Sequence, residues 1–327
     1  MKTSFLNLAQ ISICLGIVVS ATALVAQEVT PEATPETTEP RTLPFIEPFT
    51  QEDFTVLTAN VQRPNGLGWL NNNIYAVCTG DRTVYEINDT TGQTMTLIGG
   101  ITNAHTVIAE GTTSQLRLWV PDFAEDQLNL VTRGGRQVIV DNLNGPWGIA
   151  QLDDDRFMIT NLRGDTVSVV SRDGNHDTYL TDLAAPTGIA VDGEYVYVAN
   201  NGSTRRAIEW YYAPSPEAAE LNEEVETHSL VSGIQNVTNI QMAADGLLYF
   251  AYSLGTRGVV GRADPVACRD GGCTPEDIQV VAFTDLPAPL AGLLVTPDMR
   301  LYVHAMFNPN LFWVQLDTTG LDIEIRE

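Results

Sequence analysis

From about residue 50 onward, short runs of alternating apolar and polar residues are separated by turn-forming residues. The clearest run spans 186–200 and reads Pro-Thr-Gly-Ile-Ala-Val-Asp-Gly-Glu-Tyr-Val-Tyr-Val-Ala-Asn. Ile189, Val191, Tyr195 and Tyr197 keep the two-residue period of β-strands, and the Asp-Gly between them is typical of a tight turn. The segment therefore predicts two antiparallel strands joined as a hairpin.

Looser copies of this hairpin recur along the chain. When they are aligned on the glycine of Pro-x-Gly-Ile, equivalent positions are 39, 43, 40, 51 and 53 residues apart. The aligned residues are Gly66, His105, Gly148, Gly188, Asn239 and Gly292. Each copy is followed by further apolar segments, so that four short strands recur six times. Such a repeat, about 40 to 50 residues long, is typical of propeller blades. We predict an all-β fold, a six-bladed β-propeller of four-stranded antiparallel blades over 50–327.

Two details of this prediction concern the ends of the ring and its insertions. Either 54–57 or 321–325 could supply the fourth strand of the last blade, and we favour 54–57 because strands from both termini then close the ring. An insertion over 215–224 begins with Ser-Pro followed by acidic residues, which predicts a short helix. A second insertion contains Cys268 and Cys273, which we expect to form a disulfide.

The segment before the propeller divides into two parts. Lys2 precedes an uncharged apolar run over 11–26, which is shorter than the roughly 20 residues of a membrane-spanning helix. This pattern predicts a signal peptide over 1–26, the alternative being an uncleaved anchor. The Glu-, Thr- and Pro-rich segment 27–49 predicts a solvated spacer. We expect a secreted or extracytoplasmic protein with no integral membrane segment after cleavage.

The net charge of −24 lacks any compensating basic block. Nucleic acids and anionic membranes are therefore disfavoured as partners, and we expect a monomer that binds a small molecule or a protein. Cys78 ends an apolar segment and is expected to be a buried small hydrophobe. The sequence lacks a Gly-x-Ser-x-Gly elbow, a His-Glu-x-x-His pair and a phosphate-binding glycine loop, which excludes the commonest hydrolase, zinc-protease and nucleotide-binding classes.

The pattern Pro-x-Gly-Ile-Ala-Val-Asp, a turn and Tyr-Val-Ala-Asn at 186–200 is echoed at 146–161 and 64–79. It resembles NHL-repeat propellers and is similar to the gluconolactonase-like, strictosidine-synthase-like and streptogramin-lyase-like six-bladed propellers, over roughly 54–327. The resemblance implies the fold and leaves the activity open, because such scaffolds carry lactonases, lyases and binding proteins.

Two departures from these families concern the site. The gluconolactonase-like enzymes have a glutamate at the start of the first inner strand, within a calcium site, whereas here Pro64-Asn65-Gly66 contains no acid. The lyase-like members pair two histidines with a glutamate on one face. This chain offers His105 and His304, but Glu110 falls in a turn of the opposite face.

In a propeller, the start of each first strand and the turn after each second strand lie on one face near the axis, which we call the mouth. His105 and His304 are candidate catalytic bases, the alternative being that they are only hydrogen-bonded into the structure. Trp147 could be a platform for a ligand or a plug of the channel. The candidate ligand-binding residues are Asn65, Asn103, Trp147, Arg163, Asn201 and Tyr252.

Four mouth residues form an oxygen-rich set that could hold calcium, namely Asp122, Asn161, Asn200 and Asn239. The alternative is that these side chains cap strand ends by bonding to local backbone. Two functions follow from these candidates. The first is an exported propeller that binds a ligand or protein partner at its mouth without chemistry of its own, and the second is a calcium-assisted lactone hydrolase or lyase of the gluconolactonase-like kind.

Overall fold

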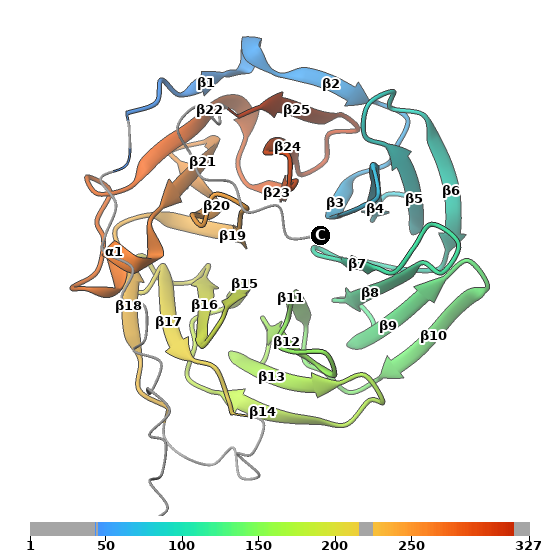
Figure 1. Cartoon of the computed structure of the whole chain (residues 1–327), viewed down its shortest axis with the longest axis horizontal. Coiled ribbons are helices and arrows are strands. Elements are labelled where there is room, and N and C mark those ends of the chain that lie inside the picture. Colours follow the sequence, from blue (N-terminus) through green and yellow to red (C-terminus); the bar gives the residue numbers. More distant parts are fainter. Residues whose placement is uncertain (1–42, 44, 216–224, 317–327) are drawn as a thin grey trace, which may run out of the picture. The chain divides into compact units, whose positions relative to one another are not determined.

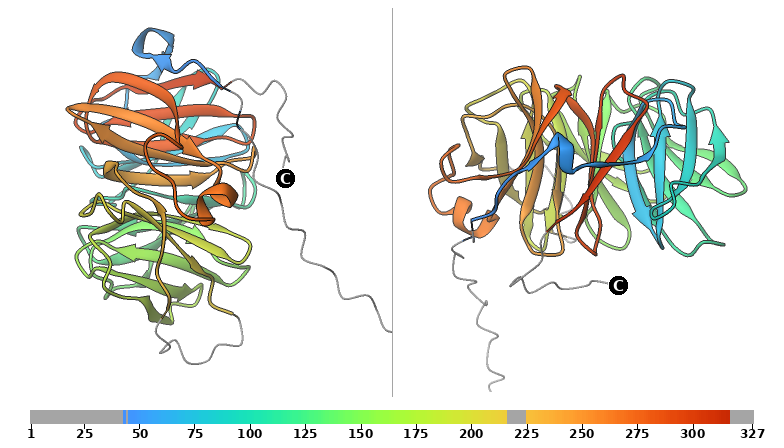
Figure 2. Two further views of the ribbon diagram at one scale, coloured as in Figure 1. Left: turned by 90° about the vertical axis from the view of Figure 1, so that its left-hand side faces the viewer. Right: turned by 90° about the horizontal axis from the view of Figure 1, so that it is seen from above.

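The computed structural model describes residues 43, 45–215 and 225–316, all within the second of the two units of the chain, Glu39–Glu327. The predicted signal peptide, most of the predicted spacer, the helix predicted over 215–224 apart from Ser215, and the segment 321–325 lie outside the described residues. The described residues form six sheets arranged as blades about one axis (Figures 1 and 2). This confirms the predicted six-bladed β-propeller.

Blades I to III each run from an inner to an outer strand in chain order. Blade I contains β3 (Pro64–Leu70), β4 (Asn73–Cys78), β5 (Thr83–Asn88) and β6 (Thr94–Gly99). Blade II contains β7 (Ile108–Glu110), β8 (Arg117–Asp122), β9 (Gln127–Thr132) and β10 (Gly135–Val140). Blade III contains β11 (Pro146–Gln151), β12 (Arg156–Asn161), β13 (Thr166–Ser171) and β14 (His176–Leu180).

The remaining blades complete the ring, and the last two also take strands from the N-terminal side of the chain. Blade IV contains β15 (Pro186–Asp192), β16 (Tyr195–Asn200), β17 (Ile208–Tyr212) and β18 (His228–Val231). Blade V contains β19 (Gln235–Met242), β20 (Leu248–Leu254), β21 (Arg257–Ala263), β22 (Gln279–Pro287) and β1 (Phe49–Thr50). Blade VI contains β23 (Leu290–Val295), β24 (Arg300–Ala305), β25 (Leu311–Gln315) and β2 (Thr55–Thr58).

The N-terminal strand closes the ring, as predicted. β2 pairs antiparallel with β25, with Thr55 opposite Trp313. The short β1 was not predicted; it pairs parallel with β22, with Phe49 opposite Ala282. The 3-10 turn η1 (Gln51–Asp53) joins β1 to β2, so that one segment fastens the outer edges of blades V and VI (Figure 1).

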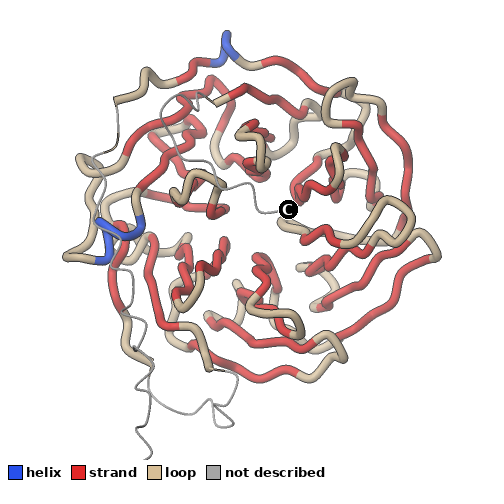
Figure 3. The backbone as a smooth tube through the Cα atoms, viewed as in Figure 1, coloured by secondary structure: helices blue, strands red, loops and turns tan. Residues whose placement is uncertain are grey.

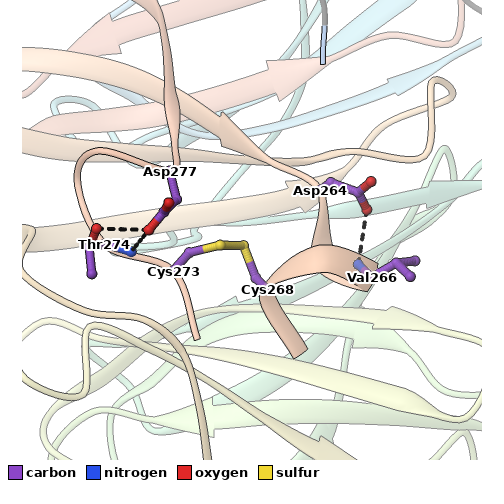
Figure 4. Close-up of a disulfide and its surroundings, with 6 residues drawn as sticks. All are labelled: Asp264, Val266, Cys268, Cys273, Thr274 and Asp277. Carbon is purple, nitrogen blue, oxygen red and sulfur yellow. Dashed lines mark hydrogen bonds between the residues drawn. A yellow bond between two sulfur atoms is a disulfide. The ribbon is translucent and has the colours of Figure 1, made fainter. Parts of the chain in front are cut away.

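The insertion between β21 and β22 fastens blade V to blade IV. It contains α1 (Pro265–Arg269), whose first turn is capped by the Asp264 carboxylate, and the predicted disulfide between Cys268 and Cys273 (Figure 4). The Cys273 amide donates to the Leu230 carbonyl over 2.8 Å, and the Cys273 carbonyl accepts from the Ser232 amide over 2.9 Å. The insertion thus hydrogen-bonds to the end of β18.

Strands dominate the described chain, and both helical segments lie at the rim of the ring (Figure 3). No described helix is long and apolar enough to cross a membrane. Apolar side chains fill the spaces between blades, and Cys78 is buried among them, without a disulfide partner in the described part of the chain. Burial raises the pKa of the Cys78 thiol, in agreement with the expected role as a buried small hydrophobe.

Candidate functional site

Trp147 contacts two other blades of the propeller at the hub. Trp147 belongs to β11 of blade III. Its indole Nε1 donates to the carbonyl of Thr238 in β19 of blade V over 3.1 Å. On the other side its ring stacks on His105 of blade II, with centroids 3.4 Å apart and planes 3° apart. Blades II and V stand on opposite sides of the ring (Figure 1). A side chain in contact with both therefore spans the hub, as the plug interpretation expects.

His105 is buried in this stack, with only 3% of its surface exposed. It occupies the aligned position that holds glycine in four blades, and the inner strand β7 begins only at Ile108. Neither ring nitrogen has a hydrogen-bond partner within the described residues. Burial lowers the pKa of His105 to about 3. The imidazole is therefore neutral near pH 7.

Phe123 and Arg163 continue the aromatic cluster toward the rim of the mouth. The Phe123 ring meets Trp147 edge-on, with centroids 5.7 Å apart. The Arg163 guanidinium lies 4.6 Å from the Phe123 centroid and donates to Asp126 Oδ1 over 2.5 Å. This arginine therefore connects the blade III loop to the blade II loop, and its charge is paired.

His304 is the second buried histidine of the mouth. It lies in β24, opposite Gly292 of β23, and has no exposed surface. Its Nδ1 is 3.2 Å from the Asn310 carbonyl oxygen. Since a carbonyl only accepts, Nδ1 carries the proton and Nε2 keeps a lone pair, for which the described part of the chain provides no donor. Burial lowers the pKa of His304 to about 4 although the bond to Asn310 opposes the shift.

Three more mouth side chains have a buried oxygen with no partner among the described residues. Asn65 donates its amide to Thr79 Oγ1 over 3.2 Å, which leaves Oδ1 unpartnered. Asn103 Oδ1 and Ser253 Oγ are likewise buried without a hydrogen-bond partner among the described residues. Ser253 lies in β20, and its sequence surroundings carry no signal that would have identified it.

The four residues considered for calcium mostly bond within their surroundings. The Asp122 carboxylate accepts from the backbone amides of Thr102, Asn103 and Ala124. Asn161 Oδ1 accepts from the Asn144 amide, and Asn200 Oδ1 accepts from the Ala184 amide over 3.0 Å. Three of the four thus make the contacts that the capping interpretation expects, whereas a calcium site needs oxygens free to converge on the ion. This donor set does not fit calcium.

The fourth residue of that set, Asn239, is buried in the inner strand β19. As an asparagine, it adds no negative charge to the mouth. In the described part of the chain, no group of three or more His, Cys, Asp and Glu side chains is placed to hold a metal ion.

The other candidates make no ring contact with Trp147 or His105 among the described residues. Asn201 is half-buried and donates to the Val237 carbonyl over 3.4 Å. Tyr252 is 5% exposed and belongs to the apolar core between blades IV and V. Glu110 accepts from both terminal nitrogens of Arg172, in the turn region opposite the mouth. It cannot act together with His105 or His304.

The fold and the hub define a six-bladed β-propeller whose channel is spanned by an aromatic side chain. A scan against models of protein families and a search of curated proteins gave no match. Solved structures do match, with sequence identities that show likeness of fold alone.

A gluconolactonase from Xanthomonas campestris has a TM-score of 0.63 at 16% identity, over 81% of this chain and 89% of its own. A putative gluconolactonase has a TM-score of 0.61 at 14% identity, over 80% and 91%. Virginiamycin B lyase from Staphylococcus aureus, catalytically inactive and in complex with quinupristin, has a TM-score of 0.54 at 13% identity, over 81% and 98%.

Proposed function

We propose that this propeller binds a small ligand, or a segment of a protein partner, at its mouth without transforming it. The observation that carries the proposal is His105, which is 97% buried on a tryptophan while both ring nitrogens lack partners among the described residues. A buried polar group without a hydrogen bond costs about 1 to 3 kcal/mol. A bound molecule that completes such bonds would recover this free energy.

The distribution of unpartnered groups supports the same proposal. Those at the mouth come from blades I, II, V and VI, which are consecutive around the ring: Asn65, Asn103, His105, Ser253 and His304. The polar residues at second-strand ends in blades III and IV, Asn161 and Asn200, are hydrogen-bonded within the protein. The ligand would therefore contact the side of the hub formed by blades V, VI, I and II.

A second candidate function is lactone hydrolysis or lyase chemistry of the gluconolactonase-like kind. It is favoured by His304, whose Nε2 keeps an unprotonated lone pair near pH 7 and could accept a proton. The likeness of fold to a gluconolactonase and a virginiamycin B lyase agrees with it. The hydrogen bonds of Asp122 and the position of Glu110 speak against it, because neither of these acids is free to act beside a mouth histidine.

Turnover assays separate the two candidates. The protein is incubated with glucono-lactone and with a streptogramin B antibiotic, with calcium and with a chelator, while calorimetry records binding. Our proposal expects no turnover in any condition. Turnover that is lost in His304→Gln and retained in His176→Gln, a substitution at the opposite face, would establish the enzymatic alternative instead.

The proposed setting of this function is outside the cytoplasm. A signal peptide over 1–26 would export the propeller domain, and the part of the predicted 27–49 spacer that precedes β1 would separate the domain from the point of cleavage. The disulfide between Cys268 and Cys273 supports an oxidising compartment. Mass spectrometry of the mature N-terminus tests this directly, since an intact Met1 would exclude cleavage.

A further inference from the structure

Each unpartnered atom at the mouth can be classified by whether it accepts or donates a hydrogen bond. Asn65 Oδ1 can only accept, because an amide oxygen carries no hydrogen, and the amide nitrogen of the same side chain already donates to Thr79. His304 Nε2 can only accept, because Nδ1 carries the proton. Asn103 Oδ1 also only accepts, while His105 and Ser253 can each donate and accept. None of these buried atoms is a donor alone. The three atoms of fixed polarity, on Asn65, Asn103 and His304, all lack a hydrogen-bond donor among the described residues.

The acceptors belong to blades that touch one another at the hub. A Cβ atom on Gly292, the cross-strand partner of His304, would lie 3.3 Å from the backbone carbonyl oxygen of Asn65. A Cβ atom on Gly66 would lie 3.3 Å from the Ala104 carbonyl oxygen, next to Asn103. Blades VI, I and II thus meet backbone to backbone at the level of these acceptors. Asn65, Asn103 and His304 therefore belong to three adjoining blades, so that one molecule at the hub can face all three.

The electrostatic setting favours a cation. The chain carries a net charge of −24, which attracts cations toward its surface. Arg163, beside the aromatic stack, is already paired with Asp126. Both mouth histidines are neutral near pH 7, so they do not repel a cation. Trp147 is only partly buried, and Phe123 lies beside it; aromatic faces of this kind attract ammonium groups.

We propose that the hub binds an organic primary ammonium group, which would donate N–H bonds to the acceptors of Asn65, Asn103 and His304 beside Trp147. This proposal rests on the proposed function and names the ligand class of that site. An ammonium group offers three donors and no acceptor, which is the complement of this lining. Carboxylates and phosphates would find donors only at His105 and Ser253 and would leave the three acceptors unpartnered.

Three probes of equal chain length test this proposal: n-butylammonium, n-butanol and butyrate. Each probe is titrated into the protein at pH 7 by calorimetry. NMR follows the histidine and indole signals in parallel titrations. We expect butylammonium to bind at least tenfold more tightly than butanol, with shifts of His304, His105 and Trp147, and butyrate not to bind. Asn65→Ala should weaken butylammonium at least fivefold, whereas Gln137→Ala on the outer strand β10 should not.

His304→Gln serves as a second variant should Asn65→Ala fail to fold, and the same weakening is expected. Binding of butanol or butyrate as tight as that of butylammonium, with shifts at His105 and His304, would overturn the ammonium proposal and leave ligand binding at the mouth standing. If none of the three probes shifts those two histidines, the acceptors are completed by water, and the ammonium proposal is wrong. If a wider compound screen also leaves both unmoved, the proposed function fails as well.

Discussion

A Cβ atom placed on Gly148 would lie 2.3 Å from the carbonyl oxygen of Thr187 in the next blade. Thr160 occupies the same seam, since its hydroxyl accepts from the Gly148 amide over 2.7 Å and donates to the Thr187 carbonyl over 2.5 Å. The glycine of the repeated Pro-x-Gly-Ile motif is therefore needed for blades III and IV to approach at the hub.

Gly148→Ala should lower the free energy of unfolding by about 1 to 3 kcal/mol, because backbone atoms on both sides of the seam must move apart. Chemical denaturation measures this. Gly99→Ala on β6 is the control, since its nearest neighbour would be 3.9 Å away, and it should change stability by less than about 0.5 kcal/mol. Equal effects of the two substitutions would contradict this account of the glycine positions.

Glu110→Gln should also destabilise the ring, at the face opposite the mouth. Burial works to raise the pKa of Glu110, but hydrogen bonds from Arg172 and Trp119 outweigh it and hold the pKa below its usual range. The substitution leaves the Arg172 charge without its bidentate partner, at a cost of about 1 to 3 kcal/mol. The double variant with Arg172→Leu should recover part of the loss; full additivity in thermal denaturation would argue against a direct coupling.

Replacing both Cys268 and Cys273 by serine should cost about 2 kcal/mol, the magnitude expected for a short disulfide loop. The effect should be local, because the insertion hydrogen-bonds to the end of β18 at Leu230 and Ser232. Hydrogen exchange should therefore accelerate at those amides and not in blades I to III. Uniform acceleration over the whole ring would show that the disulfide has no specific role between blades IV and V.

Stability should fall as the pH is lowered from 7 toward 4. The imidazole of His304 has an ordinary pKa of 6.5 and a pKa of about 4 in the folded protein. Between these values the unfolded chain binds more protons, so acid favours unfolding by roughly 3 kcal/mol for this residue at pH 4. His304→Gln should reduce the slope of stability against pH, and His176→Gln should not. Identical slopes for His304→Gln and the unaltered protein would refute a buried, neutral His304.

The architecture could be predicted from the sequence because it is periodic. The spacing of Gly66, Gly148, Gly188 and Gly292 marks the inner strands, and strand pairing is local within each blade. Two features escaped prediction because they depend on contacts between distant segments. β1 pairs with β22, more than 200 residues away, and the indole of Trp147 bonds to Thr238 across the hub. Nothing in the local sequence encodes either contact.

The candidate site was predicted less completely. His105 and His304 do lie buried at the mouth, but Asp122 and Asn200 bond to the backbone around them. An Asp or Asn at a strand end has the same sequence signature whether it caps a turn or binds an ion. Only the hydrogen bonds of each side chain distinguish the two. Ser253 was missed because a serine in an apolar strand becomes notable only when its hydroxyl is seen to lack a partner.

The four histidines of the chain provide the most direct test of a ligand site at the hub. Two are buried at the mouth, and His176 and His228 begin outer strands at the opposite face. A protein labelled with ¹⁵N-histidine is screened by NMR against small cationic, neutral and anionic compounds. Our account predicts that compounds that bind will shift the imidazole signals of His105 and His304 together and leave the other two unchanged. Shifts confined to His176 or His228, or none with any compound, would contradict it.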